Sequence, residues 1–141
     1  MFHDWDIRLA NYIESVREQS FDWAGFDCLH FANEAVIAQR GEGFADDWLG
    51  SSKSPQSAYK HYTTLLRQFG YDTVPDAIDA RLTRSVGLVP ARGSVVGRHD
   101  PENSIVGLSL GVAVSDLIAF VGHNGLVFDK PKPDDIFWAV S

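Results

Sequence analysis

The chain has 141 residues, of which 45% are hydrophobic and 22% are charged, and its formal net charge at pH 7 is -7. This composition is typical of one ordered globular domain, which we expect to span residues 1–141. The acidic balance, with no run of Lys or Arg, argues against a nucleic-acid partner.

The single cysteine excludes an internal disulfide, and no second cysteine or pair of closely spaced histidines supplies a zinc-site pattern. We therefore expect no metal and no other cofactor. The start of the chain lacks the basic and apolar regions of a secretion signal, and no stretch approaches the roughly 18 consecutive apolar residues of a membrane span. These features predict a protein made in the cytoplasm, with no membrane span.

The first part of the chain has helical periodicity. Apolar residues recur at helical spacing from Asp4 to about Gln19, and Asp4 is the expected N-cap. A second helix is predicted over residues 27–40, with Gly41 as its stop.

A well-delimited third helix follows. Ser54 is its expected N-cap, Pro55 fits the first helical position and Gly70 ends the apolar stripe. A shorter helix is predicted over residues 75–82.

Residues 41–54 are rich in Gly, Asp and Ser, and we expect a loop held down by Phe44, Trp48 and Leu49. Two interpretations of the large aromatic residues remain open. Phe44, Trp48 and Trp138 pack in the core, or they are exposed and contact a partner protein.

The pattern changes after Leu88, where Val, Ile and Gly dominate and turn residues interrupt short apolar stretches. The polar stretch 97–104 is expected to be a solvated connection, with the alternative that it borders a site. Helices first and an antiparallel sheet second predict an α+β fold. Strands are expected at 94–96, 105–114, 117–121, 126–128 and 136–140, with turns at 115–116 and 122–125.

The most informative segment places Cys28 where an aromatic loop turns into a helix. Unsatisfied backbone N–H groups and the helix dipole favour a thiolate there, which makes Cys28 a candidate nucleophile. Gly25 permits a tight turn, Trp23 can form a pocket wall, and Asp27 can cap the helix. An Asp27 carboxylate directed at the sulfur would instead oppose the thiolate. The alternative is a buried cysteine that acts only as a small hydrophobic residue.

The segment Trp23-Ala24-Gly25-Phe26-Asp27-Cys28-Leu29-His30-Phe31-Ala32 resembles the nucleophile-bearing helix of the NlpC-like, papain-like cysteine peptidases of bacterial cell-wall type. The chain is most similar to a small phage and prophage branch associated with tail proteins. The resemblance implies a papain-like NlpC-type fold, with the Cys28-bearing helix packed on the C-terminal antiparallel sheet. It also implies a location in the virion tail, other tail proteins as partners and peptidoglycan peptides as substrates.

The departure from that family that bears on catalysis concerns the base. The family's catalytic histidine falls at Ser109, and a hydroxyl cannot accept a proton near neutral pH as an imidazole can. Two histidines are candidate replacements: His123, in the turn between the late strands, and His99, beside Asp100. His30 is a poor candidate, because on a helix it projects to a different side from the cysteine two residues before it.

Three functions therefore stay open. The first is a tail-borne peptidase or amidase that cuts peptidoglycan peptides with Cys28 as nucleophile. The second is a structural or adaptor subunit of the tail tip that keeps the fold without hydrolysis. The third is an acyl-transfer or deamidating enzyme on the same fold.

Overall fold

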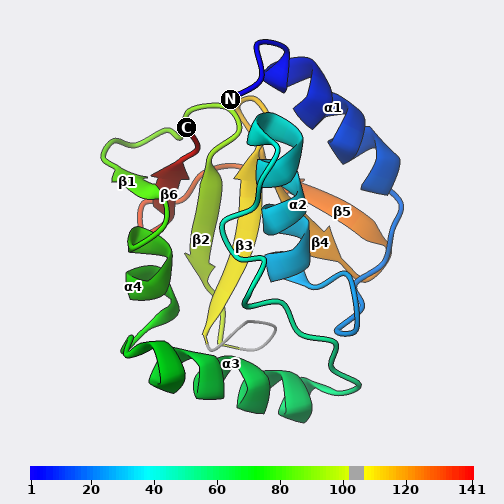
Figure 1. The fold of residues 1–141 in the computed structure, drawn as a ribbon. Coiled ribbons are helices and arrows are strands. Elements are labelled where there is room, and N and C mark those ends of the chain that lie inside the picture. The colour runs from blue at the N-terminus through cyan, green and yellow to red at the C-terminus, as the bar shows by residue number, and fades with distance from the viewer. Residues whose placement is uncertain (102–106) are drawn as a thin grey trace.

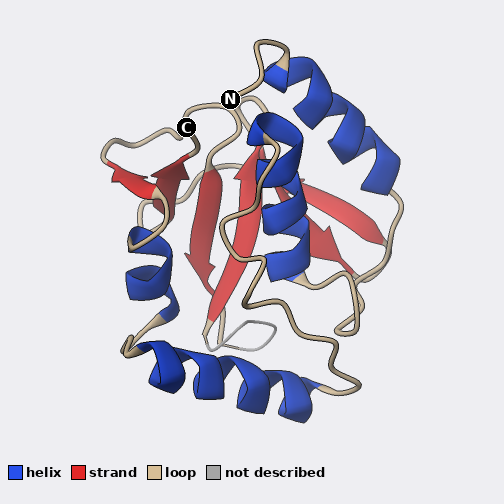
Figure 2. Cartoon of the chain, in the orientation of Figure 1, coloured by secondary structure: helices blue, strands red, loops and turns tan. Residues whose placement is uncertain are grey.

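The structure is a computed structural model that describes residues 1–101 and 107–141 (Figure 1). Over these residues the helices come first along the chain and the strands of one sheet follow (Figure 2). The helices are α1 (Trp5–Val16), α2 (Cys28–Arg40), α3 (Pro55–Phe69) and α4 (Val74–Asp79). The strands are β1 (Thr83–Ser85), β2 (Val95–His99), β3 (Leu108–Ala113), β4 (Ile118–Gly122), β5 (Gly125–Asp129) and β6 (Ile136–Ala139).

The strands form a six-stranded sheet in the order β1-β6-β2-β3-β4-β5, and every described pair is antiparallel. Helix α2 lies across one face of this sheet along β3, and α3 crosses below its lower end in the view of Figure 1. The predicted α+β class is therefore confirmed, with N-terminal helices packed on an antiparallel sheet.

Local capping chemistry explains the ends of α2 and α3. Asp27 accepts a hydrogen bond from the backbone N–H of His30, and Gly41 ends α2 in the left-handed conformation with φ 88°. Ser54 caps α3 in the same way, Pro55 follows it, and Gly70 ends the helix with φ 81°. The predicted boundaries of these two helices are confirmed.

The start of α1 differs from the prediction. Asp4 occupies the N-cap position, but its side chain makes no capping hydrogen bond. Its carboxylate instead accepts from Arg8 Nε at 2.8 Å, one helical turn later. The helix also ends at Val16, earlier than Gln19, because the chain turns there with a hydrogen bond from Gln19 N to Val16 O.

Several strand boundaries also differ from the prediction. Strand β1 was not predicted, since it is a three-residue piece that forms only by pairing with β6. The preceding helix ends at Asp79 and not at residue 82, because the chain turns there, with hydrogen bonds from Arg81 N and Leu82 N to Ile78 O. Strand β2 continues to His99, so part of the expected polar connection 97–104 is strand, and residues 102–104 lie outside the described residues. The predicted strand 105–114 begins at Leu108, and its residues 105–106 are also outside the description.

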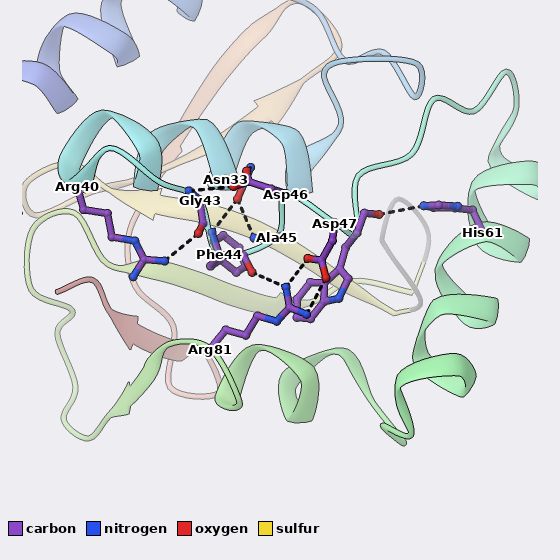
Figure 3. A network of polar contacts seen from close by, with 10 residues as sticks. Asn33, Arg40, Gly43, Phe44, Ala45, Asp46, Asp47, His61 and Arg81 are labelled. Carbon is purple, nitrogen blue, oxygen red and sulfur yellow. Dashed lines mark hydrogen bonds and ion pairs between the residues drawn. The ribbon is translucent and has the colours of Figure 1, made fainter.

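The loop 41–54 is fixed by a polar network that joins it to helix α2 and to the segment after α4 (Figure 3). The buried Asn33 side chain accepts hydrogen bonds from the backbone N–H groups of Phe44 and Ala45, both at 2.9 Å. Arg81 donates to the Phe44 carbonyl at 3.1 Å and forms a bidentate ion pair with Asp47. The loop therefore has a defined conformation and carries the start of α3 into place.

The two aromatic residues of this loop and Trp138 of β6 belong to the core. Phe44 is 2% exposed, Trp48 is 6% exposed, and Trp138 is fully buried. The guanidinium carbon of Arg81 lies 4.0 Å from the centroid of the Trp48 ring, and His61 Nε2 of α3 lies 2.9 Å from the Trp48 carbonyl. The prediction of core packing is confirmed, and the alternative of exposed contact residues is wrong. No helix in the described part of the chain is both long enough and apolar enough to cross a membrane.

Candidate functional site

A cleft of about 480 Å³ opens where strands β3 and β4 separate. The two strands pair only from Gly111 with Phe120 to Ala113 with Ile118, so the first half of β3 has no partner in β4. Beyond that point the β4–β5 hairpin diverges, and the start of α2 faces the opening. The described residues that line the cleft are Phe21, Trp23, Cys28, Pro55, Arg98, Asp100, Ser109, Leu110, Phe120, Val121, Gly122, His123, Val127 and Asp129.

Cys28 is the first residue of α2 and forms part of the cleft wall. Only 6% of the residue is exposed, so Cys28 is buried with the hydrophobic core while part of it borders the cleft. The preceding loop is closed by the hydrogen bond from Phe26 N to Asp22 O at 2.7 Å. This arrangement brings the thiol to the positive end of a helix beside a space that can hold a small substrate.

Aromatic side chains form the wall of the cleft next to the cysteine. Phe21 and Trp23 pack edge to face with ring centroids 4.7 Å apart, and both line the cleft. Gly25 lies in the exposed turn behind them, and a Cβ built there meets no atom within 4 Å. Trp23 is thus a pocket residue as predicted, whereas Gly25 is outside the lining and has room for a side chain.

Ser109 of β3 also lines the cleft, with a carboxylate partner. Its hydroxyl donates to Asp100 Oδ2 at 3.0 Å, and both residues line the cleft. Ser109 is opposite Arg98 in the β2–β3 register. Arg98 forms ion pairs of 2.8 Å with both Asp129 and Asp135, and its guanidinium stacks over Phe120. The wall is therefore polar, and its cationic group is neutralised by two carboxylates.

The two candidate histidines have different positions. His123 lies in the β4–β5 turn and lines the cleft. That turn is tied to the loop before Cys28 by the hydrogen bond from Phe21 N to Gly122 O at 3.0 Å. His99 is exposed at the end of β2, next to the cleft-lining Arg98, and strand alternation directs it to the other face. The structure brings His123 and not His99 to the cleft.

Asp27, the N-cap residue before Cys28, is buried and does not line the cleft. Its Oδ1 atom accepts from His30 N at 2.9 Å and lies 2.7 Å from His30 Nδ1, while Oδ2 accepts from the Tyr62 hydroxyl at 2.5 Å. The bond to Asp27 raises the pKa of His30, although burial opposes this effect. Burial, followed by the charge of Asp27, raises the pKa of Tyr62.

Sequence reasoning missed this network. The spacing of Asp27 and His30, three residues apart at a helix start, is a signal that could have suggested their contact. No local signal points to Tyr62, which comes from α3.

In residues 1–101 and 107–141, no group of three or more His, Cys, Asp or Glu side chains is arranged to hold a metal ion.

The fold and the site define an α+β protein with a cysteine-lined cleft at the start of a helix. The family model described as a domain of unknown function, DUF6950, matches residues 1–140, so the chain belongs to that family. Neither the comparison with curated proteins nor the comparison with solved structures gives a match.

Proposed function

We propose that this protein is a phage tail-associated protein of papain-like, NlpC-type fold that cleaves peptidoglycan peptides with Cys28 as the nucleophile. The observation that carries the proposal is the position of Cys28, at the first residue of α2 and in the wall of a cleft of about 480 Å³. The sequence around the cysteine, which resembles the cell-wall peptidases, supports the choice of substrate and the location in the virion tail.

The proposed reaction is nucleophilic acyl transfer to sulfur. The Cys28 thiolate attacks the amide carbonyl carbon, and backbone N–H groups at the start of α2 stabilise the negative charge on the carbonyl oxygen. His123 takes the thiol proton and returns it to the leaving amine. Water then hydrolyses the thioester and regenerates the thiol. The support for His123 is that it lines the same cleft and that its turn is bonded to the loop before Cys28.

A second function, a non-hydrolytic adaptor subunit of the tail tip, is favoured by one observation. By resemblance to the cell-wall peptidases, Ser109 falls where they have their catalytic histidine, and its hydroxyl donates to Asp100 Oδ2 at 3.0 Å. A cleft with this pair on its wall could bind a peptide without cleaving it.

A peptidoglycan digestion separates the two functions. Purified protein, Cys28→Ala and His123→Gln are incubated with purified sacculi, and released peptides are measured by mass spectrometry, with His99→Gln as the matched control. We expect no release by Cys28→Ala, a loss of about 100-fold or more for His123→Gln, and full activity for His99→Gln. Absence of release by the unaltered chain, together with its co-purification with other tail proteins, would favour the adaptor.

A further inference from the structure

The buried network around Asp27 joins three parts of the chain. Asp27 belongs to the loop before α2, His30 to the first turn of α2, and Tyr62 to the middle of α3. The Asp27 side chain is 1% exposed and the His30 side chain is 15% exposed. The carboxylate is thus shielded from solvent, whereas the imidazole that contacts it can exchange protons with solvent.

The charges around His30 favour its protonated form. Asp27 is 2.7 Å from the ring, and the more distant carboxylates of Glu34 on α2 and Asp22 in the loop act in the same direction. Tyr62 packs against the network from α3, and its raised pKa keeps the phenol neutral. A buried carboxylate is costly without a compensating partner, and an imidazolium at hydrogen-bond distance provides one.

The network also adjoins Cys28 along the chain. Asp27 immediately precedes Cys28 in the chain, and the charge of Cys28 contributes to the raised pKa of Tyr62. A carboxylate near a thiol opposes formation of the thiolate, and a nearby cation favours it. The protonation state of His30 therefore changes the net charge beside the nucleophile.

We propose that His30 is a positioning residue for the Cys28 thiol, because its imidazolium cancels the charge of Asp27 and keeps the thiol reactive on the acid side of neutrality. This inference rests on the proposed function, in which Cys28 is the nucleophile. His30 acts through Asp27 and does not itself take the thiol proton, since it does not line the cleft.

The test measures alkylation of Cys28 in the full chain by iodoacetamide, an uncharged probe, followed by intact mass spectrometry between about pH 5 and pH 9. In His30→Gln the amide can still donate to Asp27 but cannot carry charge. We expect this variant to react about 3- to 10-fold more slowly than the unaltered chain at about pH 6 and at a similar rate at about pH 9. The matched control is His99→Gln, which replaces an exposed histidine and is expected to keep the original profile.

Asp27→Asn provides a second, independent variant. An asparagine can still cap α2 but removes the negative charge, so we expect faster alkylation above neutrality and a weaker dependence on His30. Rates of His30→Gln that parallel those of the unaltered chain across the whole pH range would overturn the inference, as would slower alkylation of Asp27→Asn above neutrality. Either result could occur in a protein that still digests sacculi through Cys28, so failure of the inference is distinguishable from failure of the proposed function.

Discussion

The Asp27 carboxylate combines two tasks at the residue scale. It caps α2 through the His30 backbone N–H, and it binds the Tyr62 hydroxyl of α3. A capping carboxylate is usually near solvent, but here the side chain is 1% exposed and depends on protein donors for all its solvation. The position of Cys28, which follows Asp27 in the chain, is therefore coupled to the packing of α3 against α2.

Removal of the Tyr62 hydroxyl tests this coupling. In Tyr62→Phe the ring still fills its site, but Asp27 Oδ2 loses its donor, so we expect a loss of about 1–3 kcal/mol in the free energy of unfolding. Urea titration measures the change in the free energy of unfolding. Tyr59→Phe on the same helix is the control, because Tyr59 is 61% exposed and its change should stay within about 0.5 kcal/mol. Equal effects of the two substitutions would contradict a special role for the buried hydroxyl.

His30 makes part of this stability dependent on pH. Because contact with Asp27 raises the pKa of His30 in the folded protein, the stabilisation is fully present below the pKa of the unfolded chain, about 6.5. It is lost as the pH rises through the higher folded value. We therefore expect His30→Gln to cost more unfolding free energy at about pH 5 than at about pH 9, measured by urea titration at both values. A constant difference across that range would refute the assignment.

The sequence could indicate only part of this site. Cys28 and its cap Asp27 follow from local rules for helix starts, so their placement was predictable. Tyr62 is 35 residues from Asp27, and no periodicity reports such a contact. The separation of β3 from β4, which creates the cleft around Ser109, also depends on tertiary register and was not predictable from local pattern.

At the scale of elements, glycine stops determine where the helices end. Both Gly41 and Gly70 adopt the left-handed conformation, with φ 88° and 81°. A Cβ at Gly70 would meet no atom within 4 Å, whereas a Cβ at Gly41 would lie 3.1 Å from the Phe2 ring. Comparing alanine substitutions at the two positions therefore distinguishes the cost of backbone strain from the cost of steric contact.

We expect Gly70→Ala to cost about 1 kcal/mol through the left-handed backbone alone. Gly41→Ala should cost more, since the Phe2 ring must also shift. Urea titrations of the two single variants give the comparison. If Gly70→Ala proved the more destabilising of the two, the contact with Phe2 would not be the deciding factor.

The elements most accurately predicted are those with local end signals. Ser54, Pro55 and Gly70 delimit α3 by their own backbone and side-chain preferences, and the structure agrees. Strand β1 has no such signal, because its three residues are strand only through pairing with β6 at the far end of the chain. Asp4 has the right residue type for a cap, but the nearby Arg8 binds its carboxylate instead.

At the scale of the whole molecule, one main hydrophobic core joins the helices to the sheet. Leu9 of α1, Phe31 of α2, Ile78 of α4 and Trp138 of β6 belong to the same buried cluster. Neither the helices nor the sheet encloses this cluster alone. The parts of the chain on either side of the cleft therefore depend on the same packing, and this includes the helix that carries Cys28.

This shared core predicts a single cooperative unfolding transition, as is usual for domains below roughly 150 residues. The four tryptophans report on different parts of the core: Trp48 and Trp138 are buried in it, and Trp5 and Trp23 pack against it. Urea unfolding followed by tryptophan fluorescence and by far-ultraviolet circular dichroism should give coincident midpoints. Midpoints that differ distinctly between the two probes would mean that one part of the fold unfolds before the rest, and would contradict a single core shared by the helices and the sheet.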